Sequence, residues 1–127
     1  MERRFYLGLA ILLILLSLGI GTTLCMKAIH KPVETALAEA ARLAAENQQE
    51  QALAAAEKAY ERWQKYHAVT ASFADHSPMD DTDTLFQEML VYGNMEEIPH
   101  FIACCRELVV MTEAMYDAHV FSLKNLL

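Results

Sequence analysis

The segment Phe5–Met26 holds 22 consecutive residues without a charged side chain, and it constrains the chain more than any other feature. An α-helix rises about 1.5 Å per residue, so a helix of this length spans about 33 Å. That distance covers a hydrocarbon core of about 30 Å. Basic residues flank both ends, with Arg3 and Arg4 before the segment and Lys27 and Lys31 after it. We therefore predict a transmembrane helix over residues 5–26, with the lipid bilayer as its partner.

The charges beside this segment also bear on its orientation. The short head carries two arginines and the free amine, as in a signal-anchor that keeps the N-terminus inside the cell. We therefore expect a single-pass protein of the cell membrane, with residues 28–127 outside the cytoplasm. Cleavage after Gly21 or Cys25 is the alternative, because Gly19 or Thr23 supplies a small residue two places earlier. The apolar run exceeds the usual signal-peptide core of about 7 to 15 residues, which favours the anchor.

The rest of the chain is strongly acidic. Residues 28–127 carry 16 acidic and 7 basic side chains, a net charge of −9. Such a surface repels phosphate backbones, so we expect no nucleic-acid partner. The whole chain is 54% hydrophobic, which is too apolar for wholesale disorder, and 127 residues allow one small domain. The sequence thus predicts a membrane anchor over residues 1–27 and an acidic extracytoplasmic domain over residues 28–127.

Four helical stretches follow the membrane segment. Pro32 suits the first turn of a helix, so we expect a helix to begin there and to end near Asn47. A second, long helix with an alanine and aromatic stripe should extend toward Phe73. The sequence around Pro78 breaks the pattern and predicts a loop over residues 74–81.

The last two helical stretches differ in length, since a short helix precedes a long one. We predict a short third helix around residues 85–90, closed by Tyr92, Gly93 and Asn94, which include residues that tolerate a left-handed cap. The fourth helix should begin at or just before Pro99 and continue for five turns.

These patterns define the predicted fold class. No alternating strand pattern appears, so we predict an all-α protein in which one transmembrane helix precedes a small antiparallel bundle of three or four helices. Alanine-rich helices bury little area each, so a few large side chains should dominate the packing. They are Trp63, Phe73, Phe86, Phe101 and Tyr116.

The layout of these features resembles a known family. An N-terminal anchor precedes an acidic helical hairpin with Trp63, then Phe73, Asp75 and His76 before a turn, and the chain ends in Asn125–Leu127. This layout resembles the small bacterial membrane-anchored family catalogued as domain of unknown function four-three-six-three. Its members similarly place a tryptophan helix before an Asp-His turn and end in a similar tripeptide. The resemblance implies this architecture over nearly the whole chain and transfers no catalytic residue, because the family has no established activity.

One spacing would suit metal or redox chemistry. His100 and Cys104 lie four residues apart, on one face of a helix, and imidazole and thiolate can share a zinc or copper ion. A site would need a further ligand, such as Cys105 or a histidine from another helix. An amphipathic helix that happens to carry these residues is the simpler interpretation. We expect no metal or cofactor, reduced thiols, a buried Cys105, and a Cys104 near the edge of the apolar stripe.

We find no pattern typical of an active site. Asp75 beside His76 resembles an acid that orients an imidazole, but adjacent residues rarely act in this way. We expect this pair to form a turn that closes the bundle. The sequence contains neither a nucleophile elbow nor a glycine-rich phosphate loop, so we expect no catalytic residue and no enzymatic activity.

The remaining interpretation is a noncatalytic, membrane-anchored helical module for interaction or scaffolding in the bacterial envelope. Its partner would be another protein or a second copy of the chain. Small residues at Ser17 and Gly21 would favour a second copy, because they let membrane helices approach closely. The alternative is a metal-binding or redox helical protein that uses His100, Cys104 and Cys105.

Overall fold

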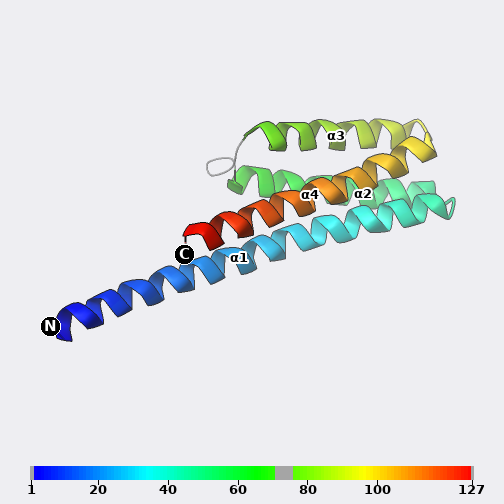
Figure 1. Ribbon diagram of the computed structural model, residues 1–127. Coiled ribbons are helices and arrows are strands. Elements are labelled where there is room, and N and C mark those ends of the chain that lie inside the picture. Colours follow the sequence, from blue (N-terminus) through cyan, green and yellow to red (C-terminus); the bar gives the residue numbers. More distant parts are fainter. Residues whose placement is uncertain (1, 71–75, 127) are drawn as a thin grey trace.

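The computed structural model describes residues 2–70 and 76–126, and it places them in four α-helices (Figure 1). The helices are α1 (Glu2–Ala45), α2 (Gln49–Thr70), α3 (His76–Asn94) and α4 (Ile98–Leu126). No strand occurs among these residues, which confirms the all-α prediction. The predicted helix end near Asn47 and the predicted helix start beside Pro99 are also confirmed.

The first helix runs unbroken from the apolar segment into the packed part of the chain. Its N-terminal half projects beyond the other helices (Figure 1). Side chains in this half are exposed, Phe5 to 68%, and the first buried side chain is His30, which is 3% exposed. Among the described residues, α1 is the single helix that is long and apolar enough to cross a membrane.

The prediction that a helix begins at Pro32 is wrong, because Pro32 lies inside α1. Its ring removes the hydrogen bond that the Ala28 carbonyl would accept, at a cost of about 3 kcal/mol. The next turns of α1 offset this cost by burying Val33 and Leu37. In addition, Arg62 Nη1 of α2 donates a hydrogen bond to the Pro32 carbonyl at 3.2 Å. Tertiary packing therefore overrides the local preference for a helix start.

The core lies between the four helices, which pack against one another in four main pairwise contacts. α1 packs along both α2 and α4, while α3 packs along α4 and, less extensively, along α2. The largest of its almost fully buried side chains are Trp63, Phe86 and Phe101. Tyr116 is partly buried against them, and Phe73 lies outside the described residues. Small buried side chains line α1 and α2, namely Ala36, Ala40, Ala41, Ala44, Ala52, Ala56 and Ala59.

The turns after α1 and α3 share one geometry. The Gln48 N–H donates to the carbonyl five residues earlier at 2.9 Å, and the Glu97 N–H does the same at 3.0 Å. The residue before each donor is left-handed, with a φ of 61° at Asn47 and 57° at Glu96. This is the Schellman arrangement, which satisfies the last carbonyls of a helix.

A constant offset of 49 residues relates the two halves of the packed region, since Asn47 and Glu96 occupy the same place in their turns. We call residues 33–66 the first hairpin and residues 82–115 the second hairpin. Every buried position of the first hairpin falls on a buried or partly buried position of the second. The match is one of geometry, because the residues at paired positions mostly differ.

Gly93 shows how the second hairpin closes. The predicted helix end at Tyr92, Gly93 and Asn94 is confirmed, because α3 ends at Asn94, but the left-handed conformation is taken by Glu96. A Cβ atom on Gly93 would lie 2.8 Å from Leu53 Cδ1 and 3.1 Å from the Phe101 ring. The glycine is therefore required by close packing against α2 and α4 rather than by its backbone angles.

The third helix is longer than predicted. It begins at His76, so the predicted loop over residues 74–81 and the predicted short helix are both wrong. Pro78 is the third residue of α3, where the N–H has no intrahelical partner, and proline there costs no hydrogen bond. Phe73 and Asp75 lie outside the described residues, and of the predicted Asp75–His76 turn only the helical backbone of His76 is described.

Candidate functional site

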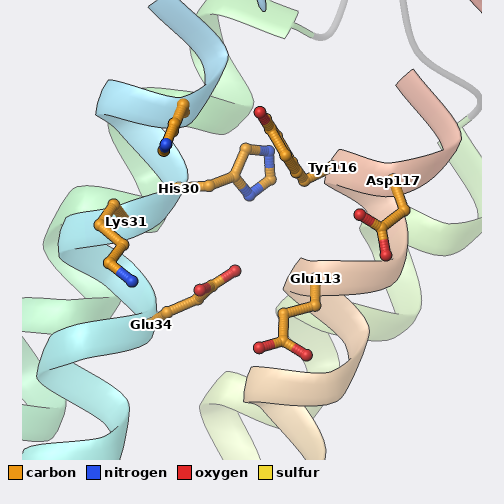
Figure 2. Close-up of a pocket in the computed structure, with 7 residues that line it drawn as sticks. His30, Lys31, Glu34, Glu113, Tyr116 and Asp117 are labelled. Carbon is orange, nitrogen blue, oxygen red and sulfur yellow. The ribbon is translucent and has the colours of Figure 1, made fainter. Parts of the chain in front are cut away.

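A pocket of about 270 Å³ lies between α1 and α4, close to the apolar half of α1 (Figure 2). Both walls consist of residues one helical turn apart, so the pocket follows the two helix axes. Its lining residues are Lys27, His30, Lys31 and Glu34 of α1 and Glu113, Tyr116 and Asp117 of α4.

Aromatic rings form the deep side of this pocket. The His30 ring is 3% exposed and lies edge-on to Tyr66 and Tyr116, with centroid distances of 4.4 and 5.7 Å. Tyr66 in turn contacts Trp63 at 5.2 Å, and Trp63 stacks on Phe86 at 5.6 Å. The pocket therefore rests on the packed aromatic part of the core, which fixes the spacing of α1 and α4.

Charged groups of both signs face the pocket. Figure 2 shows the carboxylates of Glu34, Glu113 and Asp117 pointing into the space between the two helices. Burial raises the pKa of Glu34, and repulsion from Glu113 and Asp117 raises it further, while Lys31 acts in the opposite direction. Three carboxylates against two lysines leave the site with an excess of negative charge. The raised pKa shows that the lysine does not fully compensate for this excess at Glu34.

A second depression of about 470 Å³ lies between α1 and α4, farther from the apolar segment. Most of its lining side chains are apolar, and two arginines stand among them. The lining consists of Leu37, Ala38, Ala41, Arg42, Ala45, Cys105, Arg106 and Val109. Arg42 is paired on its own helix, at 2.6 Å with Glu39 and at 3.0 Å with Glu46. We call this depression the apolar groove.

The structure separates the residues considered for metal or redox chemistry. His100 is exposed, stacks on Tyr92 at 5.0 Å and lies 3.8 Å from Glu97. Cys105 is fully buried, and Cys104, expected near the edge of the apolar stripe, is also buried at 6% exposure. Among the side chains that the structure describes, which do not include those of His76 and His119, no three from histidine, cysteine or acidic residues are grouped so that they could hold a metal ion.

From the sequence, Lys27 and Lys31 were predicted only as membrane anchors and Tyr116 only as a core side chain, and the other lining residues were not singled out. Glu113 and Asp117 are four residues apart, as are Lys27 and Lys31, so each pair shares a helix face. This spacing is a signal that was available in the sequence. The pairing of α1 with α4 was not, because it depends on long-range packing.

Comparisons of the chain with protein-family models, curated proteins and solved structures found no match. The family resemblance therefore stays a prediction, and function has to be inferred from the fold and the pocket.

Proposed function

We propose that this chain is a noncatalytic, single-pass membrane protein of the bacterial envelope, with an antiparallel bundle that serves as an interaction module outside the cytoplasm. The continuity of α1 carries this proposal. One helix joins an apolar half that is exposed on all sides to a half that α2 and α4 bury from His30 onward. A helix that is apolar all round needs a nonaqueous environment, and lipid supplies it.

The state of the buried thiols supports the noncatalytic part of the proposal. Burial raises the pKa of Cys105 to about 12. Burial also raises the pKa of Cys104, and the charges of Glu88 and Glu107 add to that increase. The thiolate is the nucleophile and the metal ligand, so burial and the raised pKa disfavour reaction or metal binding at both cysteines. The geometry thus favours an interaction module over a metal or redox protein.

Fusion of two reporters to the C-terminus tests the membrane placement. Alkaline phosphatase is active outside the cytoplasm, and green fluorescent protein exported in unfolded form is not fluorescent. We expect phosphatase activity, no fluorescence, and flotation of the full chain with membranes. A matched chain that lacks residues 5–26 should stay in the soluble fraction. Flotation of the deleted chain, or fluorescence of the full-length fusion, would contradict the proposal.

Site-specific photocrosslinking tests the interaction role. A photoreactive residue at Ala38 faces the apolar groove, whereas one at Glu57 lies on the exposed side of α2. We expect a discrete crosslinked protein from position 38 and none from position 57 in intact cells. An adduct of twice the mass of the chain would identify a second copy as the partner. Identical patterns from both positions would argue against an interaction surface at the groove.

A further inference from the structure

We propose that the pocket between α1 and α4 binds a phosphoethanolamine group, with its phosphate beside Lys27 and Lys31 and its ammonium beside the carboxylates of Glu34 and Glu113. This inference rests on the membrane placement proposed above and assigns a ligand class to the membrane-proximal end of the bundle. The ligand would be the headgroup of phosphatidylethanolamine in the adjacent bilayer.

The position of the pocket along α1 sets its depth. If Phe5–Met26 fills the hydrocarbon core, then Lys27 is the first residue beyond it. Lys31 lies about 6 Å farther along the helix axis. The headgroup layer is about 5 to 8 Å thick on each side, so Lys27 lies within it and Lys31 lies near its outer edge. The lysine end of the pocket is therefore at the level of the headgroups.

The order of charges matches the order of groups in the headgroup. The lysines are nearer to the apolar segment, and Glu34 lies about one turn beyond Lys31, with Glu113 across the gap on α4 (Figure 2). In phosphatidylethanolamine, the phosphate is attached to the glycerol and the ammonium lies beyond it on an ethylene linker. The phosphate would therefore meet the lysines, and the ammonium would meet the carboxylates.

The carboxylate end of the pocket favours a cation. Burial is the main reason that the pKa of Glu34 is raised, and repulsion from Glu113 and Asp117 raises it further while Lys31 lowers it. A primary ammonium would relieve the repulsion and donate up to three hydrogen bonds to these oxygens.

This arrangement discriminates between common headgroups. Phosphatidylglycerol has a phosphate and no cation, so it would leave the carboxylates facing each other. Phosphatidylcholine has a cation without N–H donors, so it could not form the charge-assisted hydrogen bonds. We therefore expect the pocket to bind phosphatidylethanolamine most tightly, phosphatidylcholine less tightly and phosphatidylglycerol least tightly.

Lipid retention by the full-length protein tests the inference. The protein is reconstituted in phosphatidylcholine nanodiscs that contain equal amounts of phosphatidylethanolamine and phosphatidylglycerol. After mild detergent release, native mass spectrometry counts the lipid that stays bound. We expect about five- to tenfold more bound phosphatidylethanolamine than phosphatidylglycerol. Equal retention of the two lipids would overturn the inference.

Two sets of variants connect the selectivity to the pocket. Glu34→Gln combined with Glu113→Gln should abolish the preference for phosphatidylethanolamine, and Lys31→Gln alone should weaken retention of both lipids. Matched controls on the exposed face of α2, Glu57→Gln with Glu61→Gln and Lys58→Gln alone, should behave like the wild type. Unchanged selectivity in the double pocket variant would also overturn the inference.

Two further measurements separate the possible causes of a negative result. Flotation with membranes tests the proposed membrane placement by itself. If the wild type floats but does not prefer phosphatidylethanolamine, the result contradicts the headgroup site and not the membrane placement. Addition of soluble phosphoethanolamine distinguishes the source of the group. Displacement of the lipid at micromolar concentration would assign the site to a free phosphoethanolamine compound, and resistance would assign it to the bilayer lipid.

Discussion

The first and second hairpins share the same frame of turns and buried positions, but they fill it with side chains of different size. Ala44, Ala52 and Ala56 of the first hairpin correspond to Gly93, Phe101 and Cys105 of the second. Trp63 of the first hairpin, by contrast, is much larger than Thr112, which corresponds to it in the second hairpin. All of these positions are buried.

The difference shows what determines the frame. Helical periodicity and the two Schellman turns fix which positions face inward, whereas the size of the side chain at a given position differs between the hairpins. Because interiors are close-packed, each position tolerates a change of size only as far as its own neighbours allow. Each of the following substitutions tests one pair of corresponding positions in the full-length protein. The free energy of unfolding is measured by thermal or denaturant unfolding in nanodiscs.

The largest effect should come from the pair Trp63 and Thr112. Trp63→Ala removes a ring that is 1% exposed and stacked on Phe86, so we expect a loss of about 3 to 5 kcal/mol. Thr112→Ala removes a buried methyl group and a hydroxyl that donates to carbonyls of its own helix, at 2.9 and 3.0 Å, and should cost about 1 to 2 kcal/mol. Circular dichroism measures both. Similar losses at the two sites would show that the difference in side-chain size between the hairpins does not decide the loss.

The pair Gly93 and Ala44 should give the next largest effect. Gly93→Ala gains about 1 kcal/mol of helix propensity, but its Cβ would press against the Phe101 ring at 3.1 Å. Overpacking costs about 1 to 3 kcal/mol, so we expect a net loss of about 1 kcal/mol. The reverse change, Ala44→Gly, should also lose about 1 kcal/mol, because it removes a buried methyl group and lowers helix propensity. A stabilising Gly93→Ala would show that Leu53 and Phe101 yield easily.

The left-handed residues of the two turns provide a smaller contrast. Glu96 has a φ of 57°, and a glutamate there carries a steric cost that glycine avoids. We expect Glu96→Gly to stabilise the protein by about 0.5 to 1 kcal/mol. Asn47→Gly should gain only a few tenths of a kcal/mol, because asparagine tolerates the left-handed region. Equal gains at the two turns would contradict this expectation.

The smallest effect concerns pH and the pocket beside the first hairpin. Burial and Glu113 raise the pKa of Glu34 above its ordinary value of 4.5, so the native state binds this proton more tightly than the unfolded chain. The free energy of unfolding should therefore fall as the pH rises from about 4.5 through the raised pKa. Glu34→Gln should remove this loss. Asp83→Asn, at the corresponding position of the second hairpin, is the matched control and should leave the loss in place.

Much of the fold follows from local patterns in the sequence. The apolar run, the stripe that contains Trp63, and the helix start beside Pro99 are each set by residues within a few turns of one another. The predicted helix boundaries were wrong at two prolines, where long-range packing or the absence of an intrahelical partner for the backbone N–H decides whether proline is tolerated. Pro32 stays inside α1 because packing against α2 and α4 offsets its lost hydrogen bond, and Pro78 is tolerated because it lies in the first turn of α3.

The pocket was less accessible to sequence reasoning. Spacing predicts that Glu113 and Asp117 share a face, but not that this face lies against His30 and Glu34 some 80 residues earlier in the chain. Long-range helix pairing of this kind leaves no local signature. The two cysteines show the opposite limit, since periodicity located Cys105 in the core and misjudged its neighbour Cys104, which the curvature of the packed surfaces also covers.

Because α1 is one continuous helix, its apolar half and the packed region are rigidly connected. Each residue of an α-helix turns the chain by about 100° and advances it by about 1.5 Å. Adding one residue to the apolar half would therefore rotate this half by more than a quarter turn relative to the packed region, without altering a core contact. In the membrane placement proposed above, the length of the apolar half thus determines which side of the packed region faces a neighbour in the membrane plane.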